Sequence, residues 1–188
     1  MEGGRPRALR NPSGRSAPGF TFVELLTCVA VIAILAAWGI PSFAALARDS
    51  ARTREVNQFL QAVYLARSEA IKRNGVVSLC PSGNGSTCAP GSDWRTGWLV
   101  FVNADRDSPA ARDPGENLLR AYAAWDSGHI LSNRTTLSFR AYGQMGVTAT
   151  VTFCDDRGSS AARAVIISQT GRPRVSSRSA SGGALTCT

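Results

Sequence analysis

The sequence predicts an α+β fold, in which one long N-terminal α-helix packs against a small, mostly antiparallel head of one or two β-sheets. An apolar run followed by an amphipathic pattern predicts one helix over residues 20–74. Beyond Gly75 the period changes to short β-prone runs separated by turn residues. No helix-length pattern separates these runs, so neighbouring strands are expected to pair antiparallel. A chain of 188 residues has room for one ordinary domain besides the helix.

The first half of the predicted helix is long and apolar enough to cross a membrane. Residues 20–40 contain one charged side chain, Glu24, in a stretch whose length matches a hydrocarbon core of about 30 Å. A charge at that depth costs about 2.5–3.5 kcal/mol on insertion scales, so Glu24 is expected to have a partner and a role. The preceding residues 1–19 hold four Arg and one Glu, and this positive charge favours a cytoplasmic N-terminus. Pro41 is expected to kink or locally melt the helix.

The second half of the helix, from residue 42 to residue 74, is amphipathic. Apolar residues recur there at three- and four-residue spacing, and charged residues occupy most of the remaining surface. The apolar positions are Val56, Phe59, Leu60, Val63, Ala70 and Ile71. Asn74-Gly75 is a good stop signal, which gives a helix about 80 Å long whose second half backs the head.

Six β-strands are expected beyond the helix. They cover residues 76–80, 97–102, 118–123, 136–140, 147–154 and 164–168. The run Gly97-Trp98-Leu99-Val100-Phe101-Val102 is the clearest of them, because it is apolar and ends in a polar turn.

The cysteines indicate an oxidising compartment. Cys28 lies in the apolar segment and is expected to act there as a small apolar residue. The head contains an even set, Cys80, Cys88, Cys154 and Cys187, which is typical of a disulfide framework. Three pairings are possible, and Cys80–Cys88 with Cys154–Cys187 is the one we favour. A zinc site is the alternative, but there is no CxxC spacing and the single histidine is His129.

The positive charge of the chain is concentrated at its end. The formal net charge is +8, with 20 Arg and one Lys. Residues 20–156 contain 12 basic and 12 acidic side chains, whereas residues 157–188 contain five Arg and no acid. Such segregation favours a polyanionic ligand for the C-terminal region.

The segment Gly171-Arg172-Pro173-Arg174 is the candidate binding site within this region. Gly171 permits a tight turn, and Pro173 restricts the backbone on both sides of itself. Arginine makes bidentate contacts with phosphate, so a DNA backbone is the expected ligand, bound without sequence preference. Further arginines expected to join the site are Arg178, Arg163 and Arg157. The alternative is an arginine-rich surface tail with no ligand.

Other kinds of site receive little support. Trp98 is expected in the core, while Trp94 and Trp125 are either core residues or stacking platforms for bases. Asp105 and Asp107 lack a full calcium ligand set, and a solvated turn is favoured. The sequence contains no GxSxG, P-loop or HExxH motif, so neither catalysis nor a cofactor is expected.

The N-terminal pattern resembles the type III signal of type IV pilins and type II secretion pseudopilins. The matching residues are Gly19, Phe20, Thr21, Glu24, Leu25-Leu26 and Pro41. The resemblance implies that a prepilin peptidase cleaves between Gly19 and Phe20 and methylates the new amine. It also implies that Glu24 pairs with the Phe20 amine of a neighbouring subunit during assembly.

The head resembles the GspH/FimT group of minor pilins and pseudopilins. This likeness rests on residues 66–74, the Cys80 strand and residues 94–101, while residues 171–174 are similar to the GRxR motif of the FimT branch. In that branch the motif is associated with DNA binding in transformation pili. The implied fold is the pilin fold.

Together these features predict a prepilin leader (1–19), a transmembrane and assembly segment (20–41) and an amphipathic helix with a β-rich head (42–188). The expected protein is a minor pilin with no enzymatic activity and no cofactor. It is held in the inner membrane with its head in the periplasm and later built into a pilus at the cell surface. Its expected partners are DNA, other pilins and the peptidase. The alternatives are a structural minor pilin that primes assembly and a type II secretion pseudopilin of the GspH type.

Overall fold

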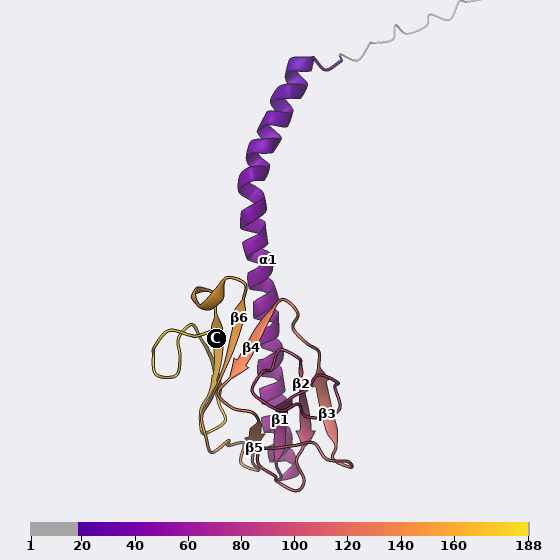
Figure 1. Ribbon diagram of the computed structural model, residues 1–188, viewed down its shortest axis with the longest axis vertical. Coiled ribbons are helices and arrows are strands. Elements are labelled where there is room, and N and C mark those ends of the chain that lie inside the picture. Colours follow the sequence, from indigo (N-terminus) through magenta and orange to yellow (C-terminus); the bar gives the residue numbers. More distant parts are fainter. Residues whose placement is uncertain (1–18, 188) are drawn as a thin grey trace, which may run out of the picture. The chain divides into compact units, whose positions relative to one another are not determined.

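The computed structural model describes residues 19–187 and contains one long helix and eight strands in this part of the chain (Figure 1). Helix α1 covers Phe22–Arg73. The chain divides into two compact units, Met1–Ala44 and Ala45–Thr188, and every described strand belongs to the second. The expected leader, residues 1–18 with Gly19, lies almost wholly outside the described residues.

Both ends of α1 follow from local sequence. At its start the backbone N–H of Glu24 donates to Thr21 Oγ1 at 3.2 Å, which satisfies one free donor of the first turn. At its end Asn74 has a φ of +50°, and the N–H of Gly75 donates to the carbonyl of Ala70 at 3.1 Å. The helix is continuous through Pro41, so the local melting expected there is not observed. By length and composition, α1 contains a stretch able to cross a membrane.

The eight strands form two antiparallel four-stranded sheets. The first has the order β3-β2-β1-β5 and the second the order β4-β6-β7-β8. Their bounds are β1 Val77–Pro81, β2 Trp98–Val102, β3 Leu118–Tyr122, β4 Gly128–Ser132, β5 Leu137–Phe139, β6 Ala149–Asp155, β7 Arg163–Ile167 and β8 Pro173–Ser176, with a 3-10 turn at Gly158–Ser160. This confirms the α+β class and the antiparallel pairing.

Two strands were not expected from the sequence, β4 and β8. β4 is short and begins with Gly128, so its apolar pattern is weak. β8 begins with Pro173, which a sheet tolerates only where no ladder bond is lost. β8 is an edge strand, paired on one side with β7.

The main core lies between the C-terminal part of α1 and both sheets (Figure 1). Phe59 of α1 is fully buried and makes edge-on contacts with Trp94, Trp98 and Phe153, the last from the second sheet. Ala62, Ala66 and Ala70 are fully buried on the same helix. Small side chains at these positions let the sheets approach the helix closely.

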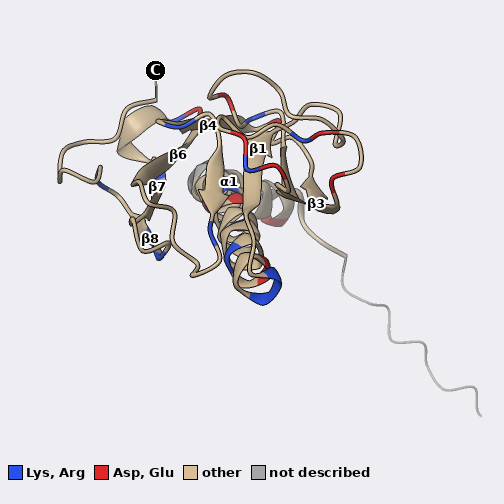
Figure 2. Cartoon of the chain, turned by 90° about the horizontal axis from the view of Figure 1, so that it is seen from below, with Lys and Arg blue, Asp and Glu red and all other residues tan. Residues whose placement is uncertain are grey.

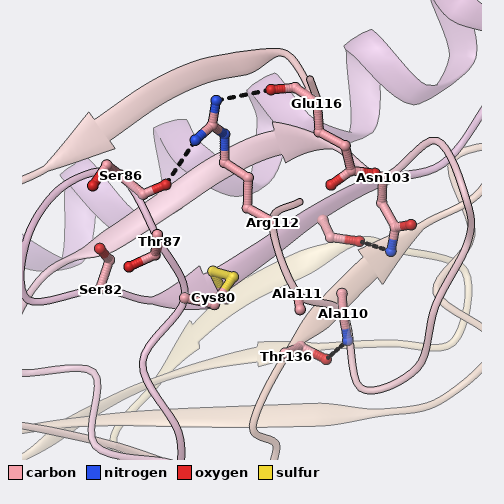
Figure 3. Close-up of a disulfide and its surroundings, with 12 residues drawn as sticks. Cys80, Ser82, Ser86, Thr87, Asn103, Ala110, Ala111, Arg112, Glu116 and Thr136 are labelled. Atoms are coloured by element: carbon pink, nitrogen blue, oxygen red, sulfur yellow. Dashed lines mark hydrogen bonds between the residues drawn. A yellow bond between two sulfur atoms is a disulfide. The ribbon is translucent and has the colours of Figure 1, made fainter. Parts of the chain in front are cut away.

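The two disulfides close the outer layers of the head. Cys80 pairs with Cys88 and Cys154 with Cys187, which is the pairing favoured from the sequence. Beside the first bridge, Arg112 donates to the carbonyls of Ser86 at 2.7 Å and Glu116 at 2.9 Å, so it joins the cystine loop to the segment before β3 (Figure 3). Beside the second bridge, Leu185 packs on the outer face of the second sheet.

Candidate nucleic-acid interface

The segment between β7 and β8 is a tight, hydrogen-bonded turn. The N–H of Gly171 donates to the carbonyl of Ser168 at 2.8 Å, and the N–H of Ser168 donates to the carbonyl of Arg172 at 3.1 Å. The Ser168 hydroxyl accepts from the N–H of Arg172 at 3.2 Å. Gly171 has a φ of +75°, which glycine adopts without strain. The turn therefore presents Arg172 and Arg174 from a defined backbone.

This turn is docked on the loop that follows β5. A Cβ placed on Gly171 lies 2.0 Å from the carbonyl oxygen of Gly143, so only glycine allows the two backbones to meet. The carbonyl of Gln169 accepts from the N–H groups of Met145 at 3.0 Å and Gly146 at 3.2 Å. Gly143 in turn accepts from Arg67 Nε of α1 at 3.1 Å. The turn is thus connected through one loop to the helix.

Arg172 and Arg174 are both exposed to solvent. Arg174 is opposite Ile166 in the register and therefore lies on the outer face of the second sheet. Neither arginine forms an ion pair with any residue between 19 and 187. Figure 2 shows blue on β8 and the loop after it without adjacent red, whereas the side of β3 mixes both colours.

The other three arginines predicted for the site, Arg178, Arg163 and Arg157, have three different surroundings in the structure. Arg178 follows β8, is exposed, and donates through Nη1 to the carbonyl of Gly182 at 3.2 Å. Arg163 is opposite Phe153 in the register, so it lies on the face of the sheet opposite to Arg174. Its Nη1 donates to the carbonyl of Ala162 at 2.8 Å. Arg178 is therefore exposed to solvent, as Arg172 and Arg174 are, whereas Arg163 lies on the other face of the sheet.

Arg157 is a correction to the predicted site. Its guanidinium donates to Asp49 at 2.7 Å and to Asp155 at 2.6 Å, and its side chain is 24% exposed. These bonds hold the pKa values of both carboxyls below their usual range and raise the pKa of Arg157. Asp155 also pairs with buried Arg52 of α1 at 3.2 Å. Arg157 is consequently a structural cation, and its charge is not available to a ligand.

Two residues near the turn were not recognised from the sequence, Arg140 and Tyr142. They belong to the turn that Gly143 closes, with the N–H of Gly143 donating to the carbonyl of Arg140 at 2.7 Å. Tyr142 is 84% exposed. Residues 20–156 are balanced in formal charge, so nothing in the sequence singled out Arg140, whose lack of an acidic partner among the described residues is visible only in the fold.

The remaining sequence candidates do not form sites. Trp94, Trp98 and Trp125 are all buried in the core, so none of them offers a face to a base. This confirms Trp98 as a core residue and assigns the other two to the core. The described residues contain no group of three or more side chains suited to hold a metal ion.

A helix with an apolar N-terminal half, joined to an antiparallel two-sheet head, is the architecture of pilins and pseudopilins. The family model of the type II transport protein GspH matches residues 55–171, more than half of the chain. The chain therefore belongs to the GspH family, as expected from the sequence.

Solved structures of the type IV minor pilin FimU from Pseudomonas aeruginosa PAO1 have the same fold. In one crystal form the identity is 24%, with 74% of this chain and 98% of FimU covered at a TM-score of 0.51. In another the identity is 23%, with 78% and 99% covered at a TM-score of 0.53. No curated protein matches the chain significantly.

Proposed function

We propose that this chain is a minor type IV pilin of the FimT kind, whose head binds DNA for uptake in natural transformation. The proposed contacts are made by Arg172 and Arg174, with help from Arg178. The observation that carries this proposal is the pair of exposed arginines, free of acidic partners within the described chain, on a turn fixed by Gly171. The GspH match ends at residue 171, so both arginines lie outside the matched region and are an observation separate from the family match.

The expected binding mode is contact with phosphates. Guanidinium groups bind phosphate oxygens bidentately, and such contacts position a protein on DNA without reading its sequence. Three arginines that each neutralise one phosphate give a log–log salt slope of about −3 on duplex DNA. The affinity of a single subunit is therefore modest and strongly dependent on salt.

The proposed life cycle follows the N-terminal resemblance. A prepilin peptidase cleaves between Gly19 and Phe20 of an inner-membrane precursor whose head lies in the periplasm. Glu24 then pairs with the Phe20 amine of a neighbouring pilin as the subunit enters the filament. The apolar segment of α1 fits both environments. Other pilins, the peptidase and DNA are thus the proposed partners, and the proposed final location is the pilus surface.

Two alternatives share this fold. The first is a structural minor pilin that primes assembly, and the FimU likeness is compatible with it. The second is a type II secretion pseudopilin, which the description of the GspH family favours. In both, Arg172 and Arg174 serve only to protect the exposed sheet edge at β8, because charged edge strands resist pairing with other chains.

The double variant Arg172→Ala/Arg174→Ala tests the proposal. We expect it to weaken duplex DNA binding by at least about tenfold, because each lost charge-assisted hydrogen bond contributes about 1.5–3 kcal/mol. The magnitude of the salt slope should fall by about 1.8 for two phosphates. Fluorescence anisotropy with the disulfide-bonded chain in nonionic detergent measures both quantities.

The matched control is Arg95→Ala/Arg120→Ala, which removes the same charge from exposed positions outside the second sheet. Its DNA affinity should stay within about threefold of that of the unsubstituted chain, which is the loss expected from the lower net charge alone. Equal losses in the two variants contradict a defined site. An unchanged affinity in the Arg172/Arg174 variant, with increased aggregation, indicates that β8 is only a protected edge.

A further inference from the structure

An open groove of about 910 Å³ lies beside the turn of the proposed interface. One wall is the loop that runs from Arg106 to Pro109, and the other is formed by residues 134–147 around β5. Three arginines and one acid line it, namely Arg106, Arg134, Arg140 and Asp107. The groove therefore has an excess of positive charge.

The charges in the groove are available to a ligand. The side chains of Arg106 and Arg140 make no ion pair or hydrogen bond with any described residue. Arg134 uses only Nε, which donates to the carbonyl of Thr148 at 3.2 Å. Asp107 is occupied by its own loop, because Oδ1 accepts from Asn103 Nδ2 and Oδ2 from the N–H of Ala111, both at 2.9 Å. Asp107 keeps its negative charge, as does Asp105 beside Arg106, so the three arginines of the lining outweigh its one acid by two charges.

The wall that carries Arg106 is held in place. Asn103 Nδ2 also donates to Ser78 of β1 at 3.2 Å, and the N–H of Ala110 donates to the Thr136 hydroxyl at 3.3 Å (Figure 3). Arg106 has a φ of +63°, a conformation uncommon for residues other than glycine. This conformation belongs to the polar turn that follows β2.

Tyr142 adds an aromatic surface to this basic groove. Tyr142 is 84% exposed, compared with 53% for Tyr64 on α1. Its turn is anchored, because Gly143 is buried beside Arg67 and Ile71 of α1. An exposed ring on a fixed turn is the kind of platform on which unpaired bases stack.

The groove lies next to the β7–β8 turn. The loop that carries Arg140 and Tyr142 donates from Met145 and Gly146 to Gln169 of that turn. The groove wall and the turn that carries Arg172 are therefore adjacent in the fold.

We propose that this groove binds single-stranded nucleic acid, with phosphates at Arg106, Arg134 and Arg140 and a base stacked on Tyr142. The inference rests on the proposed function, since it extends the DNA site of the head and assigns it a strand preference. An acidic protein partner is disfavoured, because guanidinium groups with an exposed aromatic ring match a ligand that alternates phosphates and bases.

The test compares variants of the full chain in nonionic detergent, with a labelled oligothymidylate of about 12 nucleotides and a duplex as probes. We expect Tyr142→Ala to weaken oligothymidylate binding by about fivefold or more and duplex binding by less than twofold. Tyr142→Phe keeps the ring and should keep the affinity. Arg106→Asn/Arg140→Gln should lower the single-strand salt slope by about 1.4, and asparagine tolerates the positive φ at position 106.

The control Tyr64→Ala removes an exposed ring from α1 and should have no effect. The inference is overturned if Tyr142→Ala behaves like Tyr64→Ala, or if it weakens both probes equally. It is also overturned if labelled polyglutamate binds as tightly as the oligonucleotide and loses affinity in the arginine variant. If only the Arg172→Ala/Arg174→Ala variant loses DNA affinity, the proposed function holds and the groove proposal is rejected. If only the groove variants lose affinity, the site at Arg172 and Arg174 is rejected.

Discussion

At the scale of single residues, Gly171 explains why a four-residue motif has a fixed shape. Two separate requirements meet there, a φ of +75° and an approach to the Gly143 carbonyl that leaves no room for a Cβ. The sequence indicated only the first of them. The second depends on the loop after β5, which lies 28 residues earlier in the chain.

Gly171→Ala is therefore predicted to destabilise the head by about 2–4 kcal/mol, from backbone strain together with the displaced loop. Gly158→Ala is the matched control, because Gly158 has a φ of +73° but open space around its Cβ position. It should cost only about 1 kcal/mol. Urea unfolding of both variants measures the difference, and equal losses contradict a role for the close approach.

At the scale of elements, an ion-pair network joins α1 to the end of β6. Asp155 accepts from Arg52 of α1 and from Arg157, and Asp49 accepts from both arginines. The side chains of Asp155 and Arg52 are 4% and 6% exposed, so each needs the other to remain buried. The network therefore holds the second sheet against the helix.

Asp155→Asn is predicted to lower the free energy of unfolding by about 3 kcal/mol at pH 7, because Arg52 loses its buried counter-charge. Asp156→Asn is the control, since Asp156 is exposed and pairs with Arg48 only at 3.6 Å. It should change stability by less than about 0.5 kcal/mol. Chemical denaturation measures both, and similar values for the two variants contradict the network.

Asp155→Asn also tests how the stability contributed by this network depends on pH. Arg157 holds the pKa of Asp155 below its usual range. At a pH between the folded and unfolded pKa values, the unfolded chain therefore binds more protons than the folded chain. The stabilisation is complete above the unfolded pKa of about 3.9 and is lost as the pH falls through the folded value. Asp155→Asn should flatten this acid loss. Burial raises the pKa of Glu55, which acts in the opposite direction, but Glu55 is present in both proteins.

At the scale of the whole molecule, the features predicted from the sequence are those that local patterns determine. The helix, six strands and the two disulfides depend on periodicity, turn residues and an even cysteine set. β8 was missed because an edge strand tolerates Pro173, and local propensity does not reveal an edge. Arg157 was assigned to the site although Asp155 lies two residues before it, because sequence proximity does not show which charges pair, and its other partner, Asp49, is 108 residues away. Tyr142 was missed because exposure follows from the packing of the whole head.

Charge placement also matters in the apolar N-terminal segment of the chain. Glu24 is the single charged side chain between residues 20 and 40, and we propose that it pairs with the processed Phe20 amine of a neighbouring pilin. Glu24→Ala removes an unfavourable charge from the apolar segment, so the chain should still enter the membrane fraction. It leaves the neighbouring amine unpaired in an apolar surrounding, so incorporation into filaments should fall by at least about tenfold.

Immunoblots of sheared filaments and of membranes measure the two pools separately. Val23→Ala is the matched control, because it changes an adjacent apolar residue and leaves the carboxylate in place. Normal recovery of Glu24→Ala from filaments contradicts the pairing, whereas loss from the membrane fraction as well indicates a role in insertion. A variant that remains in the membrane but is missing from filaments separates anchoring from assembly, and it leaves the head available for the DNA measurements above.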